Sequence, residues 1–366
     1  MKKVSLALAL LVLLVSQPAE AVSSPISISY GRSWPMSIAV DSARGLIYVD
    51  STSGENPPVG FTFGVVNATS RSLLRAFPLH EFPGPIAFDQ ATGEVFVAGA
   101  GNDTIEIFNA TNAIGALGTS GHQILGMTYD RSVSPDIFFT SGDGVFALDP
   151  GSSELVLSAT VPGGPFWPVL DPANGMLYVS EYLSGEIAVL SASTLAPVST
   201  IKLPSCCASE MAVNPKTQAL YASTGTNVVD MVNVATGEFE RSITVTGSPQ
   251  NSTGPIALDA VNNRVYVGSS PGGSILELDG ATGAVVGTFL VQSQVAGLAI
   301  DTDAQELYAT NYHQISVFDT KGAGSSQLLV VWATAAIAVA AVAVYALWRR
   351  GGRDRLKVQA GGRVGE

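Results

Sequence analysis

The stretch IALDAVNNRVYV (Ile256–Val267) contains a short apolar strand that ends in Asp259, a four-residue turn, and a second strand that carries Tyr266. Variants of this pattern occur seven times in the chain. The copies lie at Ile38–Val49, Ile86–Val97, Met127–Phe139, Val169–Val179, Met211–Ala222, Ile256–Val267 and Leu298–Ala309. In each copy the alternation of side chains is typical of a β-strand with two different faces.

The polar residue that ends the first strand marks the period of the repeat. These markers are Asp41, Asp89, Asp130, Asp171, Asn214, Asp259 and Asp301, and they are 48, 41, 41, 43, 45 and 42 residues apart. Seven copies at this spacing predict an all-β fold, a seven-bladed β-propeller with four strands in each blade. We expect each marker side chain to cap the turn that follows it. Two β-sandwiches are the alternative, but they do not explain one period repeated seven times.

The seventh blade lacks its last strand, because Gln314–Thr320 runs directly into a linker. The segment Ile26–Tyr30 (ISISY) near the start of the chain has a strand-like pattern and no partner of its own. We expect it to pair beside Gln314–Thr320 and close the ring, which removes an exposed sheet edge.

The two ends of the chain differ from its middle. Residues 1–21 combine Lys2 and Lys3, a short apolar run and Ala19-Glu20-Ala21, which predicts a secretory signal peptide; an uncleaved anchor helix is the alternative. Residues 328–348 carry no charge over a length of about 31 Å as a helix, which predicts a transmembrane span. The basic tail, residues 349–366, then marks the cytoplasmic side.

This organisation predicts a single-pass protein of the cell membrane. The propeller, residues 22–320, and the linker, residues 321–327, are then extracellular. Residues 22–327 contain 10 Lys and Arg against 27 Asp and Glu. A domain this acidic repels nucleic acid, so we expect no nucleic-acid partner.

Two stretches resemble a known family. Tyr178-Val179-Ser180, followed by SGEIAVLSASTLAPVSTI, and Tyr308-Ala309-Thr310-Asn311 resemble the YVTN-type propeller repeat, although the full Tyr-Val-Thr-Asn string does not occur. That family is common among microbial surface proteins, notably archaeal surface-layer proteins, and it is similar to the lactonase-like propellers. The resemblance covers roughly residues 26–320 and implies a structural repeat without catalytic residues of its own.

The up-and-down order of strands A to D within a blade defines two faces. The A–B and C–D turns lie on one, here the turn face, and the D–A and B–C connections lie on the other, the loop face. Nearly every unusual side chain falls on the loop face. These candidate ligand-binding residues are Trp34, His80, His122, Phe166, Trp167, Glu181, Tyr182, Tyr312 and His313. The short linker after blade 7 leaves from the turn face, so we expect the loop face to point away from the membrane.

The histidines and aromatic residues each have two interpretations. His80, His122 and His313 are the only histidines and could converge as a metal site, but scattered surface histidines are the favoured interpretation, and we assign no metal or cofactor. The aromatic residues are candidates for a protein- or glycan-binding platform. Aromatic residues that fill a propeller channel as plain core are the favoured interpretation.

Cys206 and Cys207 are the only cysteines and are adjacent in sequence. A vicinal disulfide that stiffens the loop, free thiols and an intermolecular bond all remain open. Four sequons, at Asn67, Asn102, Asn109 and Asn251, are candidate glycosylation sites for an exported domain.

The sequence contains no GxSxG elbow, HExxH helix or phosphate-binding loop. We therefore predict a non-enzymatic surface protein that acts in binding, adhesion or envelope assembly. The alternative is an extracytoplasmic lactonase-like or metal-dependent hydrolase that uses the same loop face, with Glu181, Glu210 and the histidines as its reactive groups. A structural tile of a surface layer is a third interpretation, and it predicts self-association.

Overall fold

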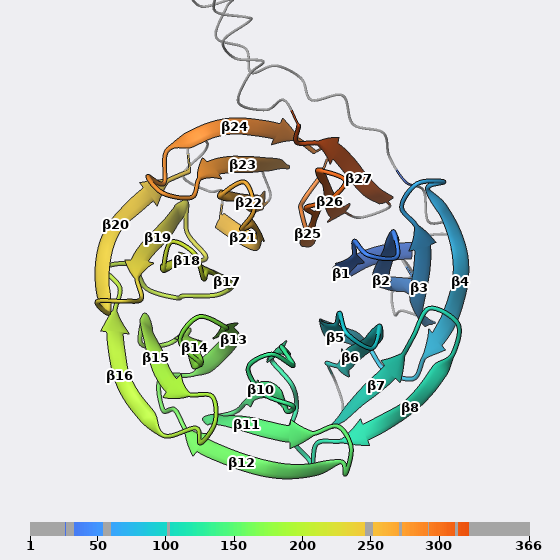
Figure 1. Cartoon of the computed structure of the whole chain (residues 1–366), viewed down its shortest axis with the longest axis horizontal. Coiled ribbons are helices and arrows are strands. Elements are labelled where there is room, and N and C mark those ends of the chain that lie inside the picture. The colour runs from blue at the N-terminus through green and yellow to red at the C-terminus, as the bar shows by residue number, and fades with distance from the viewer. Residues whose placement is uncertain are drawn as a thin grey trace, which may run out of the picture. The chain divides into compact units, whose positions relative to one another are not determined.

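The computed structural model describes Ile26 and residues 33–53, 60–100, 103–245, 252–270, 273–291, 293–311 and 314–321. These residues form seven small antiparallel sheets arranged as a ring (Figure 1). The predicted seven-bladed propeller is therefore confirmed. Within the described part of the chain no helix is long and apolar enough to cross a membrane. The predicted signal peptide, transmembrane span and tail lie outside it.

Each of the first six blades has four strands, and the seventh has three. Blades 1 to 3 contain β1 (Ser33–Asp41), β2 (Leu46–Ser53), β3 (Phe61–Asn67), β4 (Ser72–Leu79), β5 (Pro83–Asp89), β6 (Glu94–Gly99), β7 (Thr104–Phe108), β8 (Ala113–Gly118), β9 (Gly126–Thr128), β10 (Ile137–Ser141), β11 (Gly144–Asp149) and β12 (Glu154–Thr160). Blades 4 and 5 contain β13 (Pro165–Asp171), β14 (Met176–Glu181), β15 (Glu186–Ser191), β16 (Pro197–Lys202), β17 (Met211–Asn214), β18 (Ala219–Ser223), β19 (Val228–Asn233) and β20 (Glu238–Thr244). Blades 6 and 7 contain β21 (Ser252–Asp259), β22 (Arg264–Ser270), β23 (Ser274–Asp279), β24 (Val285–Leu290), β25 (Gly297–Asp301), β26 (Glu306–Asn311) and β27 (Gln314–Asp319).

The marker residues cap the A–B turns as expected. In every blade the marker Oδ1 accepts a hydrogen bond of 2.9–3.1 Å from a backbone amide two or three residues later. All of the markers except Asp130 are buried. The side chain thus replaces the strand partner that the turn amides lack.

A second series of turn-capping residues, which the sequence analysis missed, lies at the C–D turns. In six blades an Asn or Asp at the end of strand C accepts a backbone amide at 2.7–3.2 Å, and Ser191 occupies this place in blade 4. The six residues are Asn67, Asn109, Asp149, Asn233, Asp279 and Asp319. Their spacing follows the same period, so they were available in the sequence as a second marker.

The core lies between blades rather than within them. Each B strand has an aromatic residue that is 0–2% exposed, and in every blade except blade 6 it belongs to a core cluster shared with a neighbouring sheet. These residues are Tyr48, Phe96, Phe138, Tyr178, Tyr221, Tyr266 and Tyr308. A single blade has no core of its own, so the blades stabilise each other around the ring.

Strand A contains a β-bulge in blades 1, 2, 4 and 6, where two residues lie opposite one residue of strand B. In blades 1 and 4 the extra amides of Ser37 and Trp167 donate to the opposing side chains, Asp50 Oδ1 at 2.8 Å and Ser180 Oγ at 2.9 Å. In blades 2 and 6 the bulge is Gly-Pro, and the opposing residue is only Ala98 or Gly268. Because proline has no N–H, the residue opposite it needs no acceptor.

The same strand B position joins neighbouring blades. Thr140, Ser180 and Thr310 donate their hydroxyl groups to backbone carbonyl oxygens of the next blade, those of Phe166, Ser209 and Met36, at 2.5–2.8 Å. The bond from Thr310 to Met36 connects the last blade with the first.

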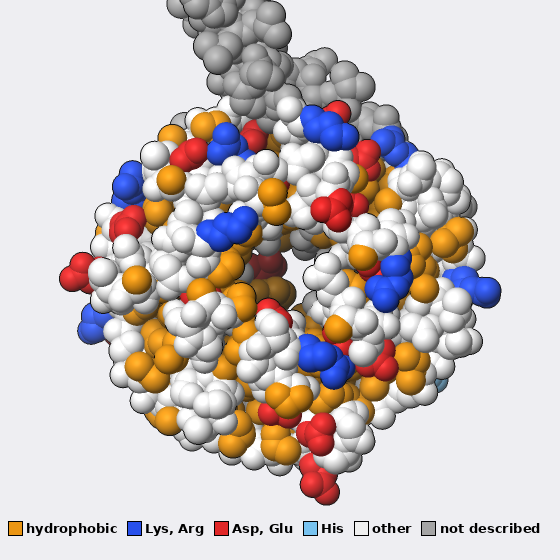
Figure 2. All heavy atoms as spheres, viewed as in Figure 1, with side chains coloured by type: hydrophobic (Ala, Val, Ile, Leu, Met, Phe, Trp, Pro, Cys, Tyr) orange, Lys and Arg blue, Asp and Glu red, His pale blue; other side chains and the backbone are white. Residues whose placement is uncertain are grey.

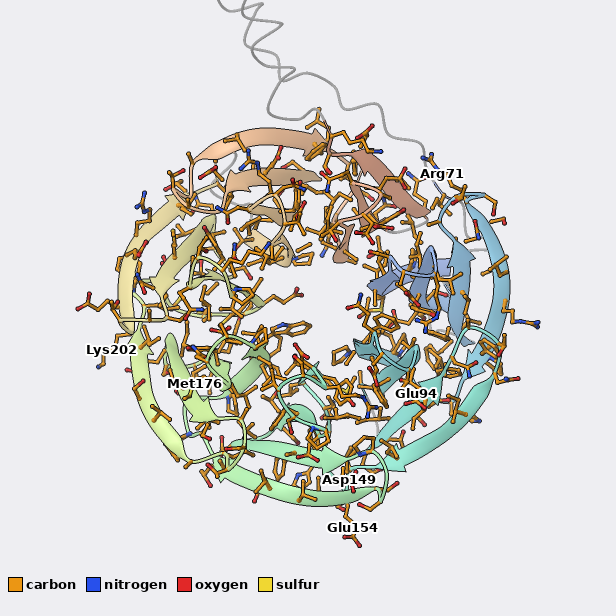
Figure 3. The ribbon with its side chains drawn as sticks, in the orientation of Figure 1. Arg71, Glu94, Asp149, Glu154, Met176 and Lys202 are labelled. Carbon is orange, nitrogen blue, oxygen red and sulfur yellow. The ribbon has the colours of Figure 1, made fainter. Side chains whose placement is uncertain are left out.

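The N-terminal segment closes the ring, as predicted. Ile26 forms an antiparallel bridge with Ile315 of β27 through both backbone hydrogen bonds, at 2.6 and 3.0 Å, and Ile26 is buried. Residues 27–30 of the predicted strand lie outside the described part. Arg71, labelled in Figure 3 where blade 1 meets blade 7, also pairs with Glu306 of blade 7, with 3.5 Å between Nη2 and Oε1.

The bulge interaction predicts the effect of Ser180→Ala. This change leaves the Trp167 amide and the Ser209 carbonyl without partners, so we expect a loss of about 1–3 kcal/mol of stability. Chemical denaturation of the full chain followed by circular dichroism measures it. Ser199→Ala, at an exposed position of the outer strand β16, is the matched control and should be neutral. Equal stabilities of the two variants would contradict this role of Ser180.

Candidate functional site

The loop face of blade 4 brings three of the predicted aromatic residues together. The ring centroid of Phe166 lies 5.9 Å from that of Tyr182 and 6.5 Å from that of Trp167. Tyr182 is 45% exposed and the next residue, Leu183, is 78% exposed. We call Phe166, Trp167, Tyr182 and Leu183 the blade 4 platform. Trp167 is its inner edge, because it also packs against the core between blades 4 and 5.

Two loops tied by backbone hydrogen bonds hold the platform in place. The Tyr182 and Leu183 amides donate to the carbonyl oxygens of Gly164 and Gly163 at 2.8 and 3.0 Å. A Cβ on Gly163 would lie 1.5 Å from Oε2 of Glu181, so a larger residue there would displace the Glu181 carboxylate. The platform is therefore preformed by backbone hydrogen bonds between the two loops.

Glu181, predicted as a ligand-face residue, is turned inward. Only 6% of the residue is exposed, and its Oε2 accepts the Ser184 hydroxyl at 2.8 Å. Its carboxylate thus supports the loop that carries Tyr182 and Leu183. Leu183 is not among the predicted ligand-face residues, although an apolar residue in a Tyr-Leu-Ser-Gly turn is a sequence signal for an exposed contact.

The two cysteines lie next to the platform. Cys206 is exposed and Cys207 is half-buried, and their Sγ atoms are 2.7 Å apart. A Cβ on Gly185, at the end of the platform loop, would lie 3.1 Å from the Cys206 Cα atom. The cysteine loop therefore packs directly on the backbone of the B–C turn of blade 4.

The histidines have separate partners. Glu106, which the sequence analysis did not single out, accepts the His80 backbone amide and contacts the His80 ring Nδ1, both at 2.9 Å. The hydrogen bond and the negative charge of Glu106 raise the pKa of His80, whose side chain is 85% exposed. His122 lies over Phe146, with ring centroids 4.0 Å apart, beside an open pocket of about 440 Å³.

The residues named for the enzyme alternative do not converge. Among the described residues, His80, His122, Glu181 and Glu210 form no hydrogen bond or ion pair with one another. No group of three or more His, Cys, Asp and Glu in this part of the chain could hold a metal ion. Tyr312, His313 and the side chain of Trp34 lie outside the described residues.

Two carboxyl groups have pKa values that burial raises well above the ordinary range. Burial raises the pKa of Asp50 to about 8, although the amides of Ser37 and Met36 bond to it, and its Oδ2 has no hydrogen-bond partner. Part of Glu210 is exposed, but its carboxyl group is enclosed, and burial raises its pKa to about 7 despite a bond from the Ile256 amide. Asp50 binds an amide of the strand A bulge of blade 1, and Glu210 binds the amide that directly follows the bulge of blade 6. We therefore regard them as structural.

A larger pocket of about 580 Å³ opens on the turn face between blades 2 and 3. Its charged groups already bind each other, because Arg131 donates to Asp89 from Nε at 2.8 Å and from Nη2 at 2.6 Å. The exposed face in Figure 2 has a central hollow with acidic and basic side chains interspersed around it. Neither the pairing of Arg131 with Asp89 nor the mixed charges around the hollow indicates a ligand that is predominantly acidic or predominantly basic.

The described sequons have a structural explanation. Asn67 and Asn109 belong to the C–D turn series, and each uses its Oδ1 to cap a turn. These asparagines therefore have a reason to be present without glycosylation. Asn102 and Asn251 lie outside the described residues, and glycosylation stays a prediction for all four.

No protein-family model matches the chain, and no curated protein matches it. The evidence for the fold is therefore the repeat and the seven-bladed ring. The resemblance to the YVTN-type repeat stays a prediction.

Asp50 predicts a pH dependence of stability. Its pKa is about 8 in the folded protein against an ordinary value of 3.8, so the folded state holds a proton that the unfolded state releases. The resulting stability is complete at low pH and is lost as the pH rises through about 8. We expect Asp50→Asn to reduce the loss of melting temperature between about pH 5 and pH 9.

Thermal unfolding of the full chain at several pH values tests this expectation. Asp143→Asn, at an exposed aspartate, is the matched control and should keep the wild-type profile. An Asp50→Asn profile identical to the wild type would show that Asp50 does not titrate as expected.

Proposed function

We propose that the chain is a membrane-anchored surface protein that presents its loop face to the exterior and binds a protein partner through the blade 4 platform. The observation that carries the proposal is the cluster of aromatic and aliphatic side chains on preformed loops, of which Tyr182 and Leu183 are exposed. The same proposal places the chain among the YVTN-type surface propellers.

The orientation is supported by where the chain leaves the ring. Blade 7 ends with strand C, β27, and strand C runs toward the turn face. The eight residues from 320 to 327 span at most about 29 Å when fully extended. With residues 328–348 as the transmembrane span, the turn face then lies near the membrane and the loop face points outward.

The composition of the platform favours a protein partner over a glycan. Protein interfaces place aromatic and aliphatic side chains at a dry centre, whereas sugars need polar groups beside an aromatic ring. Leu183 offers only apolar surface, and the carboxylate of Glu181, next to Tyr182 in the chain, is turned inward. A glycan partner and self-association are the outcomes that the experiment below separates.

The orientation is tested with the chain's own thiols, since Cys206 and Cys207 are its only cysteines. Intact cells are treated with a membrane-impermeant reductant and then with an impermeant maleimide. We expect labelling without permeabilisation, because the loop face is outside. The Cys206→Ser/Cys207→Ser double variant is the blank. Labelling that occurs only after permeabilisation would contradict the proposed orientation.

The binding surface is tested by photocrosslinking of the full chain on living cells. A benzophenone amino acid replaces Tyr182, or Val261 as the control, which is 66% exposed on the A–B turn of blade 6. We expect an adduct with a different protein from position 182 only. Leu183→Asp should reduce its yield at least roughly tenfold, as removal of a central interface residue does.

The other outcomes have distinct meanings. A crosslinked dimer of the chain would favour a surface-layer tile. No protein adduct at position 182, or the same adducts from both positions, would contradict a protein-binding platform on blade 4.

A further inference from the structure

The proposed surface function leaves the adjacent cysteines without a role. We propose that Cys206 and Cys207 form a thiol–disulfide exchange site, which reacts with the disulfide of a small thiol and closes into a vicinal disulfide. This chemistry is independent of what the blade 4 platform binds.

The local backbone already brings the two sulfur atoms together. The Cys207 thiol donates to the Cys206 sulfur across 2.7 Å, and Cys207 has a φ of 67°. A residue with a side chain rarely adopts this left-handed conformation without a reason. Here it accompanies the direct contact of the two thiol groups, which is the arrangement that ring closure requires.

The surrounding structure holds this loop on both sides. Before the pair, the Leu203 amide donates to the Gly185 carbonyl at 3.2 Å, and a Cβ on Gly185 would lie 2.9 Å from the Ser205 carbonyl oxygen. After the pair, Ala208 is fully buried and the Ser209 amide donates to Ser223 at 2.8 Å. Gly185 therefore acts as a positioning residue, because only its lack of a side chain lets the two loops touch.

The two cysteines have different environments, which assigns their order of reaction. Cys206 is exposed, so it is the first to meet a disulfide from solvent. Cys207 is half-buried, and its hydrogen bond to Cys206 raises its pKa, with burial adding to the effect. Cys207 is thus suited to act second, once Cys206 has reacted.

The exchange is balanced without any other reactant. The Cys206 thiolate attacks one sulfur of the small disulfide, whose S–S bond breaks as the first thiolate leaves. Cys207 then attacks the Sγ atom of Cys206, the mixed disulfide breaks, and the second thiolate leaves. The protons lost by the two cysteines are taken up by the two released thiolates. The protein dithiol is oxidised and the small disulfide is reduced to two thiols.

A metal chelate is the competing use of two thiols, but it needs further ligands. Within the described residues, no group of three or more His, Cys, Asp and Glu includes this pair. The platform side chains beside it are apolar. The donor set therefore favours exchange over metal binding.

The test uses the full chain in lipid nanodiscs, reduced and then freed of reductant. The protein is incubated with oxidised glutathione, quenched with acid, and examined by intact mass and by maleimide–polyethylene glycol gel shift. We expect the wild type to lose both reactive thiols, to retain no glutathionyl group and to become two hydrogen atoms lighter. Cys207→Ser should stop at a stable glutathionyl adduct on Cys206.

Two further variants test the assigned roles. Cys206→Ser should react at least tenfold more slowly than Cys207→Ser, because the remaining thiol is half-buried. Gly185→Ala should accumulate the glutathionyl intermediate, since displacing the loop slows ring closure; circular dichroism checks that it is folded.

The proposal is overturned if both wild-type thiols stay reactive, if the wild type keeps a glutathionyl group as long as Cys207→Ser does, or if only intermolecular dimers form. Because the assay uses purified protein, these outcomes are independent of the membrane orientation and of any partner.

Discussion

The capture of turn amides by an Asp or Asn side chain, buried at the A–B turns of six blades, is the interaction on which the propeller depends. It occurs at the A–B turn of every blade, and a second series repeats it at most C–D turns. Because these turns lie on one face, hydrogen bonds from turn amides to Asp or Asn side chains recur around that face. Some markers also bind the next blade, as Asp89 does with Arg131 and Asp171 with Gln218 at 3.4 Å. The same residues thus shape the hairpins and join them.

The opposite half of each blade follows a different rule. In blades 1, 2, 4 and 6 strand A has a bulge there, and the residue opposite the bulge depends on whether the bulge has a free backbone amide. Gly-Pro bulges lie opposite Ala98 and Gly268, whereas an amide-bearing bulge lies opposite Ser180 or Asp50. Asp50 is the extreme case, because it meets this need with a buried carboxyl whose second oxygen has no partner. Its raised pKa is the consequence of a backbone requirement, and a perturbed pKa in this fold is therefore weak evidence for catalysis.

Because the turn caps and the bulge interactions stabilise both halves of the blade, the sequences of the loop-face connections can vary without loss of the ring. Among the described blades, the loop-face connections of blade 4 are the clearest example. Its glycines, Gly163, Gly164 and Gly185, allow three connections to approach closely, and the result is a rigid surface with Tyr182 and Leu183 outermost and the cysteine pair beside it. Preformed loops lose little conformational entropy on association, which suits a binding surface.

The sequence by itself determined the blade count, the marker turns and the closing role of Ile26. The blade count and the marker turns depend on period-two alternation and on contacts between residues a few positions apart, which a linear sequence records directly. The closing role of Ile26 followed from the missing fourth strand of blade 7, although its partner Ile315 lies at the other end of the propeller sequence. The tertiary structure alone decided that His80 binds Glu106, that Glu181 turns inward, that Leu183 is exposed beside Tyr182, and that Gly185 supports the cysteine loop. Each of these depends on which loops the ring brings side by side, and that arrangement is set by blade packing rather than by any local pattern.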